Sequence, residues 1–124
     1  MDHIHKTDLI VVGGGPAGVT AALRARELGA SVALIERSRM GGTCTNDGCV
    51  PTRVLAHTAR LLREAEQFPE YGLQGEIPQL DFSLMMRRAA QVVYTIQEKK
   101  QLIGHLSDAE VEVFSEVGDR KSVV

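Results

Sequence analysis

The sequence predicts an α/β fold whose parallel sheet begins with a β-α-β unit. Two short apolar runs rich in β-branched residues, 8–12 and 31–35, read as strands. The segment between them, 16–28, is rich in alanine, leucine, arginine and glutamate, which favour helix. A glycine-rich turn separates the first strand from this helix. Strand, helix and strand within about 30 residues predict a right-handed crossover between parallel neighbours.

Local signals support each element of this unit. The first run is apolar without alternation, which is typical of a strand buried on both faces of a parallel sheet. Pro16 suits the first helical turn, where a missing N–H costs nothing. Gly29 stands just beyond the helix, where a left-handed residue commonly ends one.

The rest of the chain predicts two more helices and a third strand. Asp81 or Ser83 can cap the second of these helices. Apolar residues recur near helical spacing in both, at Val50, Val54, Leu55, Thr58, Leu61, Leu62 and Ala65, and at Leu84, Ala89, Val92, Val93, Ile96 and Ile103. The expected order is a loop at 38–48, a helix at 49–67, a loop at 68–80, a helix to about 106, a strand at 110–117 and a turn at 118–119.

Composition excludes several classes of function. The net charge of -2, from 14 basic and 16 acidic residues, gives no reason to expect nucleic acid or an anionic membrane as a partner. No apolar run approaches the roughly 18 residues that a bilayer requires. The first seven residues lack the features of a signal peptide, so we expect a cytoplasmic protein. In that compartment two cysteines are more often catalytic or metal-binding than a structural disulfide.

The glycine-rich turn, residues 13–18, matches G-x-G-x-x-G in the context that gives this motif meaning. Gly13 permits a tight turn, Gly15 lets a pyrophosphate approach the backbone, and Gly18 lets the helix pack on the strand. Pro16 and Ala17 complete a helix N-terminus whose N–H groups and partial positive charge suit phosphates. The motif therefore predicts a Rossmann-like dinucleotide site, against the alternative of a turn that binds nothing.

An acidic residue supports the same interpretation. Glu36 ends the second strand, 18 residues after Gly18, and can accept hydrogen bonds from the ribose hydroxyls of an adenosine. Arg37 raises the alternative of an NADP 2′-phosphate site, which Glu36 opposes by charge. The turn itself does not distinguish NAD from FAD.

Both cysteines, Cys44 and Cys49, lie in the segment 41–53, Gly-Gly-Thr-Cys-Thr-Asn-Asp-Gly-Cys-Val-Pro-Thr-Arg. A zinc site would need about four ligands, and His57 supplies only a third. A redox pair fits better, since Cys49 falls near a helix N-terminus that favours a thiolate. Three glycines, Gly41, Gly42 and Gly48, leave room for a flat ring beside the backbone.

This cysteine segment resembles the active-site signature of the class I pyridine nucleotide–disulfide oxidoreductases, which include dihydrolipoamide dehydrogenase, glutathione reductase and mercuric reductase. The resemblance covers residues 8 to about 118 and includes the spacing between the two motifs. It implies an FAD-binding domain at 8–118, after a flexible start at 1–7 and before a tail at 119–124. It also implies soluble homodimers in the full-length family, with NAD(P)H as co-substrate.

The resemblance also assigns roles to residues of this chain. Cys44 resembles the interchange thiol that attacks a small disulfide substrate, and Cys49 resembles the thiol that lies against the flavin. Electrons would pass among NAD(P)H, FAD, the Cys44–Cys49 disulfide and the substrate. The residues implied to contact FAD are Gly13, Gly15, Pro16, Ala17, Gly18, Glu36, Arg37, Gly42, Thr43, Gly48, Arg53 and, near the adenine, Gly118.

The chain departs from the family pattern in two respects. Arg53 stands where the family usually has lysine, which keeps the charge but changes its shape. The chain also has one G-x-G-x-x-G and no counterpart of the NAD(P) and interface domains, so we expect activity only within a longer chain or complex. Two alternatives stay open: a non-catalytic nucleotide-binding or interaction module, and a small thiol redox protein without flavin.

Overall fold

The computed structural model describes residues 6–115 and confirms an α/β fold with a parallel sheet. Its sheet consists of β1 (Leu9–Val12), β2 (Val32–Ile35) and β3 (Glu112–Phe114), in the order β1-β2-β3. Both pairs are parallel, with Leu9 opposite Val32 and Ala33 opposite Glu112. The carboxyl ends of all three strands therefore meet at one edge of the sheet.

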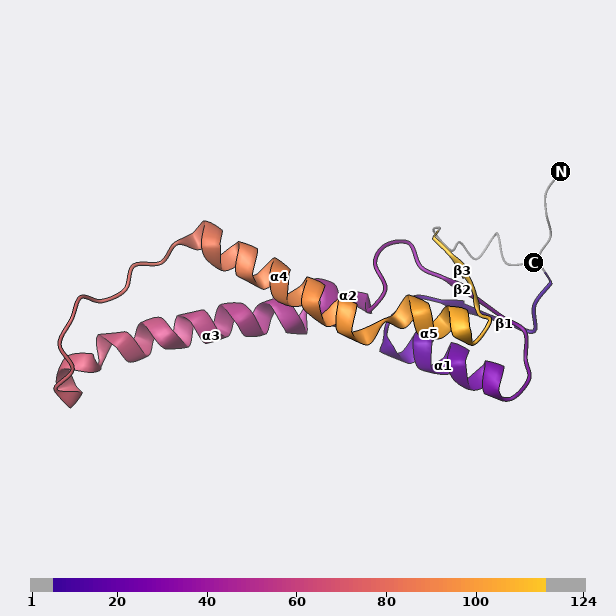
Figure 1. Cartoon of the computed structure of the whole chain (residues 1–124), viewed down its shortest axis with the longest axis horizontal. Helices are drawn as coiled ribbons and strands as arrows, with labels where there is room; N and C mark the ends of the chain where they lie inside the picture. Colours follow the sequence, from indigo (N-terminus) through magenta and orange to yellow (C-terminus); the bar gives the residue numbers. More distant parts are fainter. Residues whose placement is uncertain (1–5, 116–124) are drawn as a thin grey trace.

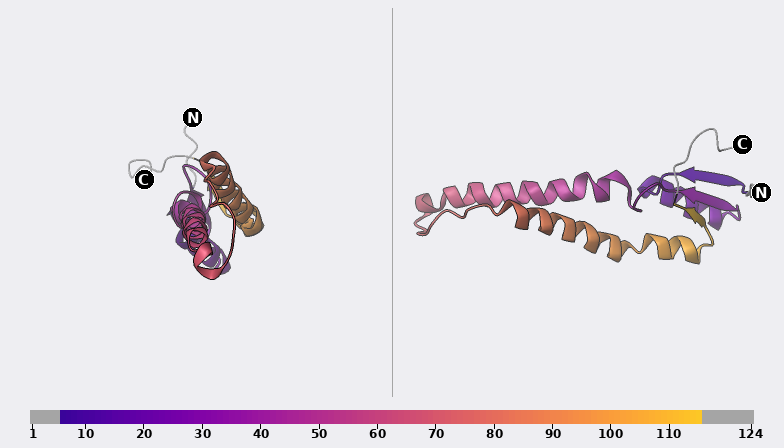
Figure 2. Two further views of the ribbon diagram at one scale, coloured as in Figure 1. Left: turned by 90° about the vertical axis from the view of Figure 1, so that its left-hand side faces the viewer. Right: turned by 90° about the horizontal axis from the view of Figure 1, so that it is seen from above.

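Helices of very different length connect these strands (Figure 1). The described elements between β1 and β3 are α1 (Pro16–Glu27), β2, α2 (Gly42–Asn46), α3 (Cys49–Glu66), the 3-10 turn η1 (Phe68–Tyr71), α4 (Phe82–Lys100) and α5 (Leu102–Asp108). Figure 2 shows α3 and α4 extending side by side away from the sheet as a helical hairpin. The connection between β2 and β3 therefore projects far from the strands that it joins.

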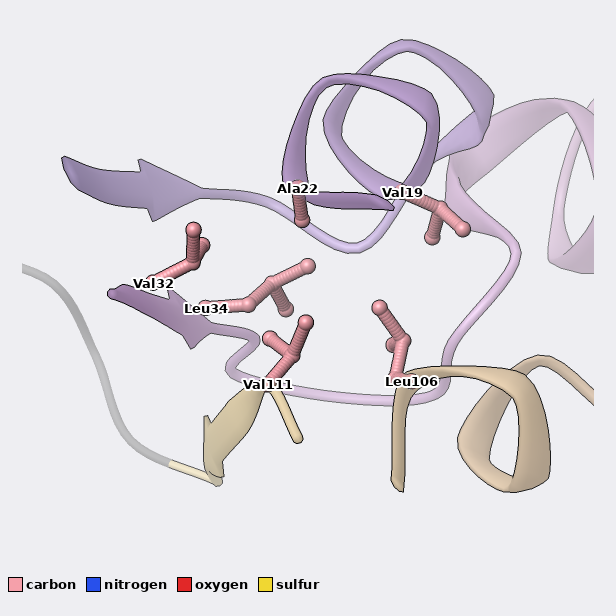
Figure 3. Close-up of a cluster of buried hydrophobic side chains, with 6 residues drawn as sticks. All are labelled: Val19, Ala22, Val32, Leu34, Leu106 and Val111. Carbon is pink, nitrogen blue, oxygen red and sulfur yellow. The ribbon is translucent and has the colours of Figure 1, made fainter. Parts of the chain in front are cut away.

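The hydrophobic core lies between one face of the sheet and the pair α1 and α5. Val32 and Leu34 are two residues apart on β2, so their side chains share a face. Figure 3 shows these side chains between those of α1 and those near α5. The buried cluster comprises Val19, Ala22, Val32, Leu34, Leu106 and Val111. This small core fixes the edge of the sheet from which the glycine turn emerges.

Arg26 ties α1 to the end of α5. Its Nε donates to the carbonyl of Ala109 at 2.7 Å, and a second guanidinium nitrogen donates to the carbonyl of Ala30 at 3.0 Å. The third nitrogen pairs with the carboxylate of Glu110 at 2.6 Å. All three branches of the rigid fork are thus used to hold the two helices over the sheet.

Three of the predicted segments were wrong in detail. The first strand, predicted to be buried on both faces, is at the edge of the described sheet and leaves Val12 63% exposed. The predicted loop at 38–48 contains the helix α2. The predicted helix to residue 106 ends at Lys100, because Gln101 adopts a left-handed backbone with φ 42°. This break redirects the chain so that Leu106 enters the core.

The helical hairpin buries fewer residues than its sequence pattern predicted. Ala65 on α3 and Ala89 and Val93 on α4 are buried. Predicted members of the apolar stripes that are instead exposed are Leu55, Leu61 and Leu84 on the hairpin and Ile103, which lies on α5. Two packed helices cover only one narrow face of each other, so a broader stripe remains in contact with solvent.

Of the two caps predicted for α4, Asp81 and Ser83, the structure uses Asp81. Asp81 is the N-cap residue, and its carboxylate accepts a hydrogen bond from the backbone N–H of Leu84 at 2.9 Å. Within residues 6–115, no helix combines the length and apolar character needed to cross a membrane.

The left-handed Gln101 provides a test of this break. Replacing Gln101 with glycine removes the clash of Cβ with the backbone, and we expect the free energy of unfolding to rise by about 0.5–1 kcal/mol. Gln101→Ala shortens the side chain but keeps its Cβ, so it should give no such gain. Urea denaturation of both variants measures the difference, and equal stabilities for them would contradict the strain.

Candidate functional site

The glycine turn after β1 has the geometry that its sequence predicts. Gly13 has φ +105°, in the left-handed region, and its N–H donates to the carbonyl of Ile35 at 2.8 Å. A Cβ on Gly18 would collide with the carbonyl oxygen of Gly13 and crowd the side chain of Val11. Gly13 therefore supports the sharp turn, and Gly18 supports close packing of α1 against β1.

The N-terminus of α1 is open at this turn. Gly15 is the N-cap residue, Pro16 is in the first turn, and no side chain caps the end of the helix. The N–H groups of Ala17 and Gly18 belong to the first turn, where an α-helix offers no internal acceptors. An anion beside this turn would meet unpaired donors and the positive end of a helix of 12 residues.

The two glycine-rich motifs meet directly. A Cβ placed on Gly42 would lie 2.8 Å from the Cα of Gly15, and Gly42 itself has φ +69°. The N–H of Gly41 donates to the carbonyl of Gly14 at 2.9 Å. The backbone that carries the cysteines is therefore packed on the backbone of the turn, with no side chain between them.

Glu36 is held at the end of β2 by backbone donors. Its carboxylate accepts from the N–H of Gly14 at 2.6 Å and from the N–H of Ser38 at 2.9 Å. The bond from Gly14, followed by that from Ser38, holds the pKa of Glu36 below its ordinary value. The charge of Arg37 makes a smaller contribution in the same direction. An ionised carboxylate thus faces the turn, while Arg37 is exposed to solvent.

The cysteines lie at the junction of two helices. Cys44 lies within α2, whereas it was expected in a loop, and Cys49 is the first residue of α3 as predicted. Both are free thiols and exposed. Hydrogen bonding to Cys49 raises the pKa of the Cys44 thiol. A Cβ on Gly48 would lie 3.5 Å from the Cα of Cys44, so the chain turns back between α2 and α3.

Gly48 makes this return possible. A Cβ there would lie 3.0 Å from the carbonyl oxygen of Thr43, closer than side chains normally approach. Asp47 ends α2 by donating its N–H to the same carbonyl at 2.9 Å. The four-residue separation of the cysteines is thus spanned by a tight turn between two helices.

Two buried polar residues beside Cys44 were missed as site residues. Asn46 donates to the carbonyls of Arg39 and Met40 at 2.9 and 3.3 Å, and accepts from Gln97 on α4 at 2.5 Å. Thr45 is 1% exposed and accepts from Lys100 at 3.3 Å. Asn46 is part of the quoted cysteine signature, and a polar residue fixed in such a motif could have signalled a buried role.

A cavity of about 560 Å³ opens at the carboxyl ends of β2 and β3. Ligands of open α/β sheets bind at this edge. The volume lies within the roughly 300–1,000 Å³ of small-molecule sites. Its lining includes Glu36, Met40, Thr45, Lys100, Gln101 and Ser115. Of these, the sequence predicted Glu36 alone as a site residue.

The structure gathers most of the predicted site residues and leaves others aside. Gly13 to Gly18, Glu36 and the segment around Gly42, Thr43 and the cysteines form one region. Arg53 is exposed on α3, four residues after its start at Cys49. Gly118 lies outside the described residues. Within residues 6–115, no three or more histidine, cysteine or acidic side chains group as metal ligands.

Comparison with known proteins agrees with this geometry. The family model of pyridine nucleotide-disulphide oxidoreductases matches residues 7–119. The chain belongs to this family. The match covers both glycine motifs and both cysteines, which confirms the resemblance inferred from the sequence.

Several relatives within the family are dihydrolipoyl dehydrogenases. Dihydrolipoyl dehydrogenase of Zymomonas mobilis is 40% identical over 111 residues, which are 90% of this chain and 23% of that protein. Those of Pseudomonas aeruginosa and Bacillus subtilis are 41% and 37% identical over 67% and 77% of the chain. The aligned parts are 18% and 21% of these two relatives, so the chain spans about a fifth of their length.

The contact between the two glycine motifs can be tested by stability. In Gly42→Ala, both the left-handed backbone and the collision with Gly15 oppose the new Cβ, so we expect a loss of about 3 kcal/mol in the free energy of unfolding. Gly29→Ala is the matched control, because Gly29 has φ +88° but nothing within 4 Å of a Cβ. It should lose about 1 kcal/mol.

Equal losses in the two variants, measured by urea denaturation, would contradict the close approach of Gly42 to Gly15.

The hydrogen bonds of Glu36 predict a dependence of stability on pH. Since its folded pKa lies below the ordinary value of 4.5, its contribution is present above that pH and is lost as the pH falls through the folded pKa. Glu36→Gln should lower the free energy of unfolding by about 1 kcal/mol at pH 7. The difference from the native chain should shrink on acidification below about pH 4.5, as urea titrations across pH measure.

A difference that stayed constant from pH 7 to pH 3 would show that the charge of Glu36 contributes nothing.

Proposed function

We propose that this chain is the FAD-binding segment of a flavoprotein disulfide oxidoreductase and carries its redox cysteine pair. The observation that carries this proposal is the contact of Gly15 with Gly42. It fixes a turn suited to phosphates directly against the backbone that bears Cys44 and Cys49. A dinucleotide held at the turn would thereby reach the cysteine pair without any further element of the chain.

The residues present fit an FAD. Gly13 has open space where a Cβ would stand, and the backbone at Gly15 meets only Gly42. The uncapped N-terminus of α1 suits the pyrophosphate, and the carboxylate of Glu36 can accept from the ribose hydroxyls. The cavity beside Glu36 is large enough for the adenosine half of the cofactor.

FAD would supply hydride and electron transfer, and the protein residues perform the thiol chemistry. In the reducing direction the Cys44 thiolate attacks one sulfur of a substrate disulfide, and the other sulfur leaves as a thiolate. Cys49 then attacks the Cys44 sulfur of this mixed disulfide, which releases the substrate as a dithiol. Two electrons pass to the substrate, and the cysteines end as a Cys44–Cys49 disulfide.

We assign Cys44 as the attacking thiol and Cys49 as the thiol next to the flavin. Both are exposed, so accessibility does not separate their roles. The family pattern separates them, and the position of Cys49 at the N-terminus of the long helix α3 supports it, since this end stabilises a thiolate. In keeping with the names of the relatives, we propose a lipoyl-type disulfide as the substrate in this direction, its dihydrolipoyl form as the product, and NAD(P)H as the electron donor.

A cofactor titration tests this proposal. We expect the purified chain, loaded with FAD, to quench flavin fluorescence on binding, and Glu36→Ala to weaken binding about tenfold through the loss of charge-assisted hydrogen bonds to the ribose. A chain that cannot be loaded with FAD would overturn the proposal. If it still formed a Cys44–Cys49 disulfide reversibly, it would be a thiol redox protein without flavin.

The roles of the two cysteines have a spectroscopic test. With FAD bound and the cysteines reduced, a thiolate against the flavin gives a long-wavelength absorption band. We expect Cys44→Ser to retain this band and Cys49→Ser to abolish it. A band that survived in Cys49→Ser would overturn the assignment.

A further inference from the structure

Lys100 is the last residue of α4, far in sequence from the cysteine segment but joined to it in space. Its Nζ donates to the hydroxyl of Thr45 at 3.3 Å. Thr45 is 1% exposed and directly follows Cys44 in α2. Lys100 is exposed as a whole, but this bond holds its ammonium group at a defined point beside α2.

Thr45 is itself fixed from the opposite side. A Cβ on Gly41 would lie 3.1 Å from the Cβ of Thr45, so the threonine is packed against this glycine backbone. The N–H of Gly41 in turn donates to the carbonyl of Gly14 in the glycine turn. One turn earlier on α4, Gln97 bonds to Asn46 at 2.5 Å. Two polar contacts one turn apart, from Gln97 and from Lys100, therefore hold the end of α4 against α2.

We propose that Lys100 is a positioning residue for the cysteine pair: its bond to Thr45 holds a positive charge beside Cys44 and so makes the attacking thiol more reactive. This inference rests on the proposed function for the assignment of Cys44 as the attacker. The expected effect of the Lys100 charge on the Cys44 thiol does not depend on bound flavin.

The charges around Cys44 agree with this role. Hydrogen bonding to Cys49 on α3 is the main cause that raises the pKa of Cys44, and the charge of Lys100 on α4 acts more weakly in the opposite direction. The other charged side chains close in sequence on these elements are Asp47 after α2, Arg53 on α3, and Glu98 and Lys99 on α4. A thiolate beside a cation is favoured over a thiol, and thiolate is the attacking form.

Sequence reasoning could not find this residue. Lys100 is one of two adjacent lysines at a helix end, where cations are common because they complement the helix dipole. The break at Gln101 ends α4 at Lys100, and the packing of α4 against α2 then brings this lysine to Thr45.

The test is the pH profile of alkylation at Cys44 in the reduced full chain without flavin. Iodoacetamide is the probe, and cleavage before Asp47 separates the two cysteines for mass spectrometry. In Lys100→Gln we expect the midpoint for Cys44 to rise by about 0.5 pH unit, a loss of about threefold in rate below the midpoint. Lys100→Arg should restore the native profile.

Lys99→Gln is the matched control, because it removes the same charge from the adjacent residue and leaves the bond between Lys100 and Thr45 in place. It should leave the profile unchanged. A native profile in Lys100→Gln, or an equal shift in Lys99→Gln, would overturn the proposal. Loss of FAD binding with an intact Lys100 effect would instead count against the proposed function.

A second variant, Thr45→Val, tests the proposal independently in case Lys100→Gln does not fold. Thr45→Val keeps the packing on Gly41 but removes the hydroxyl that anchors Lys100, so the midpoint should rise in the same direction. Raising the salt concentration should shift the native profile upward as well, since the pair is only partly buried and is screened. The absence of both effects would overturn the proposal without any need for Lys100→Gln.

Discussion

The close approach of Gly42 to Gly15 is the contact on which the site depends. Backbone meets backbone there, because a Cβ on Gly42 would come within 2.8 Å of the Cα of Gly15. Two features follow from it: the glycine turn and the cysteine segment share one surface, and α2 begins beside the start of α1. Glycine is required here for contact between two segments as well as for access of a ligand, and the sequence motif alone suggested only the ligand.

Buried polar groups then fix the orientation of α2, which is too short to be stable alone. Asn46 joins the segment before α2 to the end of α4, and Thr45 is packed on Gly41 while bonding to Lys100. Each of these groups has its partners, which avoids the cost of an unsatisfied buried donor or acceptor. Cys44 directly precedes these two buried residues in α2 and is itself exposed.

The long hairpin of α3 and α4 brings the end of α4 back to the cysteine segment. It starts at Cys49 and returns at Lys100, so residues about 50 apart in the chain meet at α2. Its own packing is narrow and buries small residues such as Ala65 and Ala89. The packing of α4 on α2 therefore depends on two polar contacts, Gln97 with Asn46 and Lys100 with Thr45, which single substitutions can test.

Local patterns in the sequence were sufficient for the β-α-β unit, the glycine turn, the cap at Asp81 and the start of α3 at Cys49, because each depends on residues a few positions apart. The family followed from the spacing of two motifs. The exposure of β1, the helix α2, the break at Gln101 and the roles of Thr45 and Lys100 required the tertiary structure. These features depend on contacts between segments that are far apart in the chain, and the local periodicity of a sequence does not indicate which distant segment will pack against it.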